Sequence, residues 1–143
     1  MNKHFILAED DEDDVALFLE AIKSAKVPIH VTTVLSCDDI MGHLSPHELP
    51  QLVIMDTSLP GKSALECIAA IRAAFTAEQL PVMVLSTSLP SSLQVKGYIA
   101  GFNLMLKKPD TFKEVQKLVR RLYLVEWANH PALTLHEFYQ LDI

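Results

Sequence analysis

The stretch ILAEDDEDDVALF, residues 6–18, contains three kinds of sequence in succession. An apolar run ends at residue 8, six consecutive carboxylates occupy residues 9–14, and an apolar pattern with helical spacing begins at residue 15. A strand followed by a polar loop and a helix is the repeating unit of α/β folds. Six adjacent like charges repel one another, so they either face open solvent or surround a bound cation.

Short apolar runs of the same kind recur along the chain and predict five β-strands. They are HFILA (4–8), HVTTVL (30–35), LVIM (52–55), VMVLS (82–86) and LMLK (104–107). Several are apolar on successive residues, which is typical of a strand buried on both faces.

The segments between these runs have apolar residues three or four apart, which is the period of an amphipathic helix. Three stripes are clear: Val15, Phe18, Leu19 and Ile22; Leu65, Ile68, Ala69 and Ile71; Val115, Leu118, Val119 and Leu122. The segments CDDIMGHL and PSSLQVKGYIA fill the remaining gaps less clearly. Parallel strands need crossover helices, so this alternation predicts a doubly wound α/β fold with a five-stranded parallel sheet and helices on both faces.

Length and composition favour a single domain, because 143 residues, 50% of them apolar, can bury one core. No run is long enough to span a membrane, and the N-terminus becomes acidic too early for a signal peptide. We therefore expect a cytoplasmic protein with no membrane partner. A net charge of −6 argues against broad binding of nucleic acid.

The two cysteines, Cys37 and Cys67, lie in apolar surroundings and lack the spacing of metal ligands. A domain of this length needs no disulfide for stability. We expect both to be free thiols in or near the core.

Charged and hydroxyl side chains follow the predicted strands, where an open α/β sheet binds its ligands. Glu9 and Asp10 come after the first strand, Asp56 after the third, Ser86 ends the fourth and Lys108 follows the fifth. Carboxylates crowded at one edge repel unless a cation lies among them, and hard oxygen ligands suit Mg²⁺. An aspartate beside Mg²⁺ can also act as a nucleophile toward phosphorus.

The last carboxylates of the acidic run have a simpler interpretation. Asp13 and Asp14 are expected only to face the positive N-terminus of the first helix.

Together these motifs resemble the receiver domain of two-component response regulators, over about residues 4–127. ILAEDD looks like the acidic pair of that family, VIMDTSLPG like its phosphoacceptor strand and loop, VMVLSTS like its switch-hydroxyl strand, and LMLKKP like its lysine-proline signature. Ser86 lies 30 residues and Lys108 lies 52 residues after Asp56, as in the family. Four motifs in order at the right spacing make the resemblance specific.

The resemblance implies a flavodoxin-like sheet with strand order 2-1-3-4-5. The receiver domain would span residues 1–128, and residues 129–143 would form a tail without an output domain. Thr134 and Glu137 have the spacing of a capping box, which predicts a short helix in that tail.

The same resemblance implies the chemistry of the site. Asp56 would accept a phosphoryl group from a sensor histidine kinase or phosphotransfer protein. Mg²⁺ would be held by Asp10, Asp56 and the carbonyl of Ser58, with Glu9 acting mainly through a metal-bound water. Ser86 and Lys108 would contact the phosphoryl oxygens. The bond from Lys108 to Pro109 would be cis.

The resemblance also implies a switch and not an enzyme, with at most self-phosphorylation from small donors and slow autodephosphorylation. The signal would pass to a downstream protein by direct contact, and a homodimer through the fourth and fifth helices is compatible with it. Two other classes stay open: a Mg²⁺-dependent aspartyl phosphohydrolase, and a degenerate receiver that acts as a constitutive binding module. Ser58 stands where such a hydrolase usually has its second aspartate.

Two positions of the implied site, the switch hydroxyl and the usual aromatic residue, have more than one interpretation or depart from the family. Thr87 competes with Ser86 for the hydroxyl role, although spacing and strand alternation favour Ser86. Met105 stands where the family usually has a tyrosine or phenylalanine, which changes how the signal is transmitted.

Two further groups of side chains have more than one interpretation. His43 and His47 have the spacing of a metal pair, but Pro46 lies between them, so surface histidines are favoured. The aromatic residues Trp127, Phe138 and Tyr139 either form a partner site or dock the tail on its own domain, and docking is favoured.

Overall fold

The computed structural model describes residues 2–141. Residue 1 of the expected receiver domain and residues 142–143 of the expected tail lie outside the described residues.

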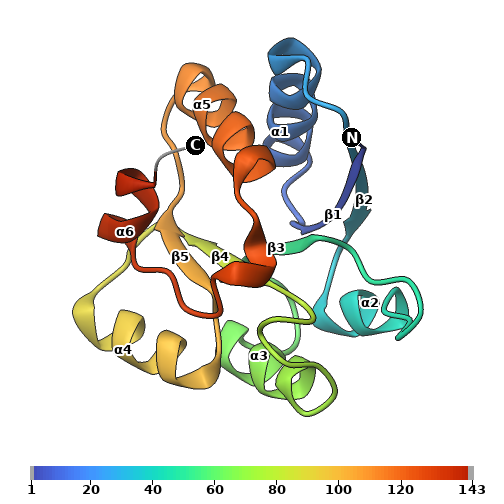
Figure 1. Cartoon of the computed structure of the whole chain (residues 1–143), viewed down its shortest axis with the longest axis vertical. Helices are drawn as coiled ribbons and strands as arrows, with labels where there is room; N and C mark the ends of the chain where they lie inside the picture. The colour runs from blue at the N-terminus through green and yellow to red at the C-terminus, as the bar shows by residue number, and fades with distance from the viewer. Residues whose placement is uncertain (1, 142–143) are drawn as a thin grey trace.

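Within residues 2–141, five strands alternate with five α-helices as the apolar runs and stripes predict, and a sixth helix follows in the tail (Figure 1). The strands are β1 (Lys3–Ala8), β2 (Ile29–Val34), β3 (Leu52–Asp56), β4 (Val82–Ser86) and β5 (Leu104–Lys107). The helices are α1 (Glu12–Ala25), α2 (Cys37–Gly42), α3 (Ala64–Arg72), α4 (Ser91–Ala100), α5 (Phe112–Leu124) and α6 (Leu135–Gln140), with a 3₁₀ turn η1 (Trp127–Asn129) before α6. Within residues 2–141, no helix is both long enough and apolar enough to cross a bilayer.

The strands form one parallel sheet in the order β2-β1-β3-β4-β5, which confirms the expected topology. Helices α1 and α5 cover one face of the sheet, and α2, α3 and α4 cover the other (Figure 1). Strands β3 and β4 are buried along their whole length, because helices cover them on both sides.

Alternate residues of each strand feed two separate cores. Phe5, Leu52 and Ile54 pack with α1, α5 and the segment after α5. Ile6 and Val53 pack with α2, α3 and α4. This division follows from the period of two along a strand, and it holds the carboxyl ends of the strands in one rigid edge.

The prediction that every residue of the helical stripes faces the core is wrong for two residues. Leu19 of α1 and Ala69 of α3 are exposed, whereas Phe18 and Ile68 beside them are buried. The stripe on each helix is narrower than the sequence indicated, because each helix contacts the sheet along one line only.

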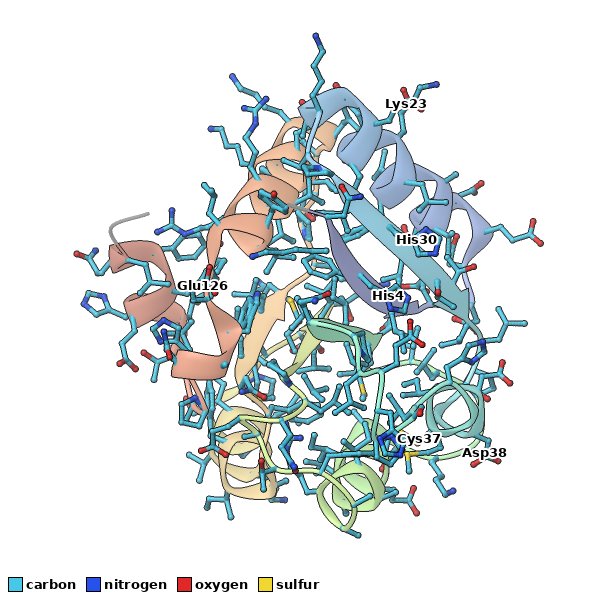
Figure 2. All side chains as sticks on the ribbon, turned by 45° about the vertical axis from the view of Figure 1, so that its right-hand side comes forward. His4, Lys23, His30, Cys37, Asp38 and Glu126 are labelled. Carbon is cyan, nitrogen blue, oxygen red and sulfur yellow. A yellow bond between two sulfur atoms is a disulfide. The ribbon has the colours of Figure 1, made fainter. Side chains whose placement is uncertain are left out.

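The expectation of free cysteines is also wrong, because Cys37 and Cys67 form a disulfide. Both residues are buried, as expected, with Cys37 in the first turn of α2 and Cys67 in the second turn of α3. Their helices pack side by side on the same face of the sheet, which brings the two Cα atoms to 5.7 Å, a normal separation for a disulfide (Figure 2). The two cysteines are 30 positions apart in the sequence, and no local pattern indicates this proximity.

The segment after α5 docks on its own domain. Trp127 and Phe138 are buried, and their rings are stacked with centroids 6.5 Å apart, which confirms the favoured interpretation for these two aromatic residues. Tyr139 is 60% exposed and does not share in this core. Thr134 and Glu137 form the predicted capping box at the start of α6.

Hydrogen bonds fix this segment beside β5, between α4 and α5 (Figure 1). The backbone N–H of Leu133 donates to the carbonyl of Asn103, and the Tyr98 hydroxyl of α4 donates to the carbonyl of Leu133 at 2.7 Å. The side-chain amide of Asn103 donates to the carbonyl of His130. The edge of the sheet at β5 is therefore covered by the chain's own tail.

Met105, which replaces the usual aromatic residue of the family, is buried against α4. A Cβ atom at position 97 would overlap its thioether, so Gly97 makes room for the methionine. The Tyr98 hydroxyl lies 3.4 Å from the backbone nitrogen of Met105, and it thus links α4, β5 and the tail.

Candidate functional site

The predicted site residues meet at the carboxyl edge of the sheet. Asp56 and Ser86 are the last residues of β3 and β4. Glu9 and Lys108 come directly after β1 and β5. Because parallel strands end at the same edge, residues up to 99 positions apart in the sequence become neighbours there.

Lys108 is the centre of this arrangement. Its Nζ atom forms an ion pair with the Asp56 carboxylate, lies 3.1 Å from Oε2 of Glu9 and donates to Oδ2 of Asp14 at 3.0 Å. Glu9 is only 5% exposed and Asp56 only 4% exposed. One ammonium group therefore contacts three crowded carboxylates and offsets part of their charge, and two of these carboxylates are buried.

Asp14 is a member of the site that the sequence interpretation missed. Asp11 caps α1 by accepting from the backbone N–H groups of Asp13 and Asp14, and this places Asp14 in the first helical turn. Side chains in a helix lean toward its N-terminus, so the Asp14 carboxylate reaches back over the end of β1. The sequence signal for this placement was the position of Asp14 three residues after Asp11, the residue that caps the helix.

Glu9 and Asp10, the acidic pair that the resemblance implied, lie in different surroundings. Carboxylate oxygens of Glu9, Asp14 and Asp56 lie within 4.8 Å of one another, and this is the only group of three or more potential metal ligands in residues 2–141. Asp10 is exposed and outside that group, so its role as a metal ligand stays a prediction. His43 and His47 form no such group either.

Burial and the crowded charges shift the ionisation of the site. Burial, followed by the hydrogen bond with Asp56, raises the pKa of Glu9 to about 7. Burial alone would raise the pKa of Asp56, but hydrogen bonds with Glu9, Lys108 and Ser58 hold it below its ordinary value. Burial would lower the pKa of Lys108, and the carboxylates of Asp56, Asp14 and Glu9 outweigh that effect and raise it. Asp56 is thus an anion at neutral pH, and Glu9 is the carboxyl group of the pair that is more easily protonated.

The loops after β3 and β4 bring further polar groups to Asp56. The backbone N–H of Ser58 donates to Oδ1 of Asp56 at 2.9 Å. The buried Ser86 hydroxyl donates to the carbonyl of Ser88 and accepts from the Thr57 hydroxyl at 3.3 Å. Thr87, the competing hydroxyl, is exposed. Thr87 lies just after the end of β4, so of the two hydroxyls only that of Ser86 is buried in the sheet edge.

The expected cis bond between Lys108 and Pro109 is wrong, because residues 2–141 contain no cis peptide bond. The backbone N–H of Lys108 donates to the carbonyl of Ser86 at 2.8 Å, and its Nζ reaches all three carboxylates with the bond trans. The trans isomer is favoured by roughly 0.5–1 kcal/mol before proline, and the contacts of Lys108 do not oppose it.

The donor atoms of the site fit a small hard cation. Carboxylate oxygens of Glu9, Asp14 and Asp56 converge within 4.8 Å, and oxygen donors are the ligands that Mg²⁺ takes in proteins. The loop after β3 also contacts Asp56, through the backbone N–H of Ser58.

A family comparison gives the class of protein. Residues 5–120 match the model of the response regulator receiver domain. The chain belongs to this family. Receiver domains are parts of two-component signalling systems, and this receiver domain has the sheet order that the resemblance implied, with Lys108 paired to Asp56 at the edge of the sheet.

Two curated relatives are response regulators from Synechocystis sp. The chain is 28% identical to Rre1 over 139 residues, which are 94% of this chain and 60% of Rre1. It is 27% identical to Rcp1 over 140 residues, which are 91% of this chain and 94% of Rcp1. The chain therefore spans less than two thirds of the first relative and nearly all of the second.

Solved structures agree on the fold. The phosphorylated cyanobacterial phytochrome response regulator RcpA superposes with a TM-score of 0.74 at 28% identity, covering 85% of this chain and 91% of RcpA. The Mn²⁺-bound form of Rcp1 superposes with a TM-score of 0.73 at 24% identity, covering 86% of this chain and 96% of Rcp1.

Removal of the central ammonium group tests its structural role in the receiver domain. We expect Lys108→Met to lower the free energy of unfolding by about 2 kcal/mol at neutral pH, because carboxylates in a buried cluster lose their counter-charge. Uptake of a proton by Glu9, whose pKa is already about 7, limits the loss. Urea unfolding measures the difference, with the exposed Lys96→Met as the matched control. Equal stability of the two variants would contradict the role of Lys108.

Proposed function

We propose that this receiver domain accepts a phosphoryl group on Asp56 from a sensor histidine kinase or a phosphotransfer protein. The observation that carries the proposal is the ion pair between Lys108 and the buried Asp56 carboxylate at the end of β3. An anionic carboxylate at the open edge of a sheet, beside a fixed ammonium group, is suited to attack phosphorus.

The proposed reaction is a direct transfer. A carboxylate oxygen of Asp56 forms a bond to phosphorus while the bond from phosphorus to the donor's histidine nitrogen breaks, and the electron pair of that bond returns to the nitrogen. The product is an acyl phosphate on Asp56. Such transfer depends on positioning and on compensation of charge at the phosphoryl oxygens more than on covalent help from other side chains.

Lys108 and Ser86 supply groups for those oxygens. The Lys108 ammonium group is held beside Asp56 by three carboxylates, and it offsets the added negative charge. The Ser86 hydroxyl is one strand away, and its present partner is the carbonyl of Ser88. A turn of this hydroxyl from Ser88 to the phosphoryl group would couple the acyl phosphate to the loop before α4.

Mg²⁺ would be held by Asp56, Asp10 and the Ser58 carbonyl, with Glu9 acting through a bound water. It would offset the charge that develops on the transferred group. The convergence of Glu9 and Asp56 supports the presence of a cation at this edge, and it adds Asp14 as a neighbouring carboxylate.

The proposed output is contact with a downstream protein in the cytoplasm, and a homodimer is compatible with it. The added charge at the strand ends would shift the loop before α4, and α4 is linked to the tail through the Tyr98 hydroxyl. No catalytic output is proposed beyond self-phosphorylation from small donors and slow loss of the phosphoryl group.

The first experiment is incubation of the chain with acetyl phosphate and Mg²⁺, followed by intact-protein mass spectrometry. We expect one phosphoryl group per chain, and no label when the metal is removed with EDTA. Repeated turnover of a phosphate ester without stable label would favour an aspartyl phosphohydrolase instead. Absence of both label and Mg²⁺ binding would favour a constitutive binding module.

A further inference from the structure

A groove runs between α5 and α6 and shares Lys108 with the cluster around Asp56. Its volume is about 880 Å³. It begins at Thr87 and Lys108 at the edge of the sheet and extends along α5 as far as Tyr139. The family match ends at residue 120, whereas α6 spans Leu135–Gln140, so one wall of this groove lies beyond the part that receiver domains share.

The α6 wall is held firmly against α5. The Arg121 guanidinium donates to the carbonyl of Phe138 through two nitrogens, at 3.0 and 2.7 Å, and to the carbonyl of Leu141 at 3.3 Å. It also lies over the rings of Phe138 and Tyr139. The groove is therefore formed before any partner arrives, which reduces the entropy cost of binding.

The rim of the groove carries cations that form no ion pair. Lys107, Lys117 and Arg120 are exposed, and none of the three forms an ion pair within the described part of the chain. The acids on the lining are Asp110 and Glu114, so the unpaired cations still outnumber the acids there. In a chain whose net charge is −6, this rim is a local concentration of positive charge.

Apolar groups lie beside these cations. Leu124 is 51% exposed and Tyr139 is 60% exposed, and both line the groove. The side chains of Leu118 and Phe138 form its buried floor. An exposed leucine and an exposed aromatic ring above an apolar floor are typical of a surface that takes an apolar side chain from a partner.

We propose that the groove between α5 and α6 binds an acidic segment of the downstream protein. Carboxylates of that segment lie on Lys107, Lys117 and Arg120, and an apolar side chain enters beside Leu124 and Tyr139. Charge complementarity selects this partner, because the unpaired cations of the rim attract carboxylates, whereas the acidic remainder of the chain repels them. The inference rests on the proposed function, since Lys108 of the phosphoacceptor site also lines the groove.

The test is the binding of a fluorescein-labelled peptide in which pairs of glutamates alternate with leucine, measured by fluorescence anisotropy on the unphosphorylated chain. We expect saturable binding. The double variant Lys117→Glu with Arg120→Glu should bind at least about tenfold more weakly, because two attractions become repulsions.

The matched control is Lys23→Glu with Lys96→Glu, which makes the same change in net charge on α1 and α4. Lys23 extends into solvent away from the tail (Figure 2). We expect this control to bind within about twofold of the wild-type chain, since the altered charges lie outside the groove.

The apolar contact is tested separately with Tyr139→Ala, for which we expect roughly fivefold weaker binding. Its control is Ile99→Ala, at a residue that is 81% exposed on α4. The milder pair Lys117→Gln with Arg120→Gln should give an intermediate loss, which keeps the test valid if charge reversal disturbs the fold.

Three results would overturn the proposal: no saturable binding of the acidic peptide, equal losses in the groove variant and its control, or equally tight binding of a peptide with lysine in place of glutamate. Tighter binding of a single-stranded oligonucleotide, lost in the groove variant, would also overturn it in favour of nucleic acid. Labelling of Asp56 is measured on the same preparations, so failure of phosphoryl transfer and failure of peptide binding are separate results.

Discussion

The Asp56→Asn variant is expected to take up at least about a hundredfold less phosphoryl label from acetyl phosphate than the wild-type chain. An amide has the shape of the carboxylate but lacks its negative charge, so it is a very poor nucleophile toward phosphorus. The hydrogen bond from the Ser58 backbone to the side chain at position 56 can persist through the amide oxygen, so the loop should keep its conformation. Intact-protein mass spectrometry measures the label.

The control for this prediction is Asp38→Asn, which removes a carboxylate that is 84% exposed on α2. It should be labelled like the wild-type chain. Equal labelling of Asp56→Asn would place the acceptor on another carboxylate, and Glu9 and Asp14 are the neighbours that would then need to be replaced.

Reduction of the disulfide between Cys37 and Cys67 is expected to lower the free energy of unfolding by about 3 kcal/mol. The cross-link joins residues 30 apart, and it limits the conformations of the unfolded chain more than those of the folded chain. Urea unfolding with and without reductant gives the difference and requires no mutation.

The control is the double variant Cys37→Ala with Cys67→Ala, whose stability should not respond to the reductant. A thiol titration of the denatured wild-type chain provides the decisive count. Two free thiols without reductant would show that the cysteines are not cross-linked, and no free thiol is the expected result.

The prediction of the fold from sequence succeeded because its signals are local. Runs such as VMVLS and LMLK have the period and composition of buried strands, and the structure begins and ends β4 and β5 at the predicted residues. The parallel order of the sheet followed from the alternation of strands with helices and from the resemblance to receiver domains. Leu19 and Ala69 were wrong because periodicity shows which residues share a side of a helix, but not how wide its contact with the sheet is.

Most residues of the candidate site could be predicted because their positions also follow from local signals. Each of Glu9, Asp56, Ser86 and Lys108 is placed by the end of a strand, and parallel strands end at one edge. Asp14 was missed because it is placed by the first turn of α1, and its contact with Lys108 depends on the angle between that helix and the sheet. The bond before Pro109 is trans, which is the intrinsically favoured isomer, and the resemblance alone had implied the cis isomer.

Local spacing was sufficient to predict the order of strands and helices along the chain and the residues at the strand ends, because both follow from patterns within a few residues. Three features could be seen only in the folded chain: the pairing of Cys37 with Cys67, the contact of Asp14 with the site, and the groove between α5 and α6. These features depend on how helices pack against one another. Such packing is set by contacts between side chains far apart in the chain, and no local pattern records it.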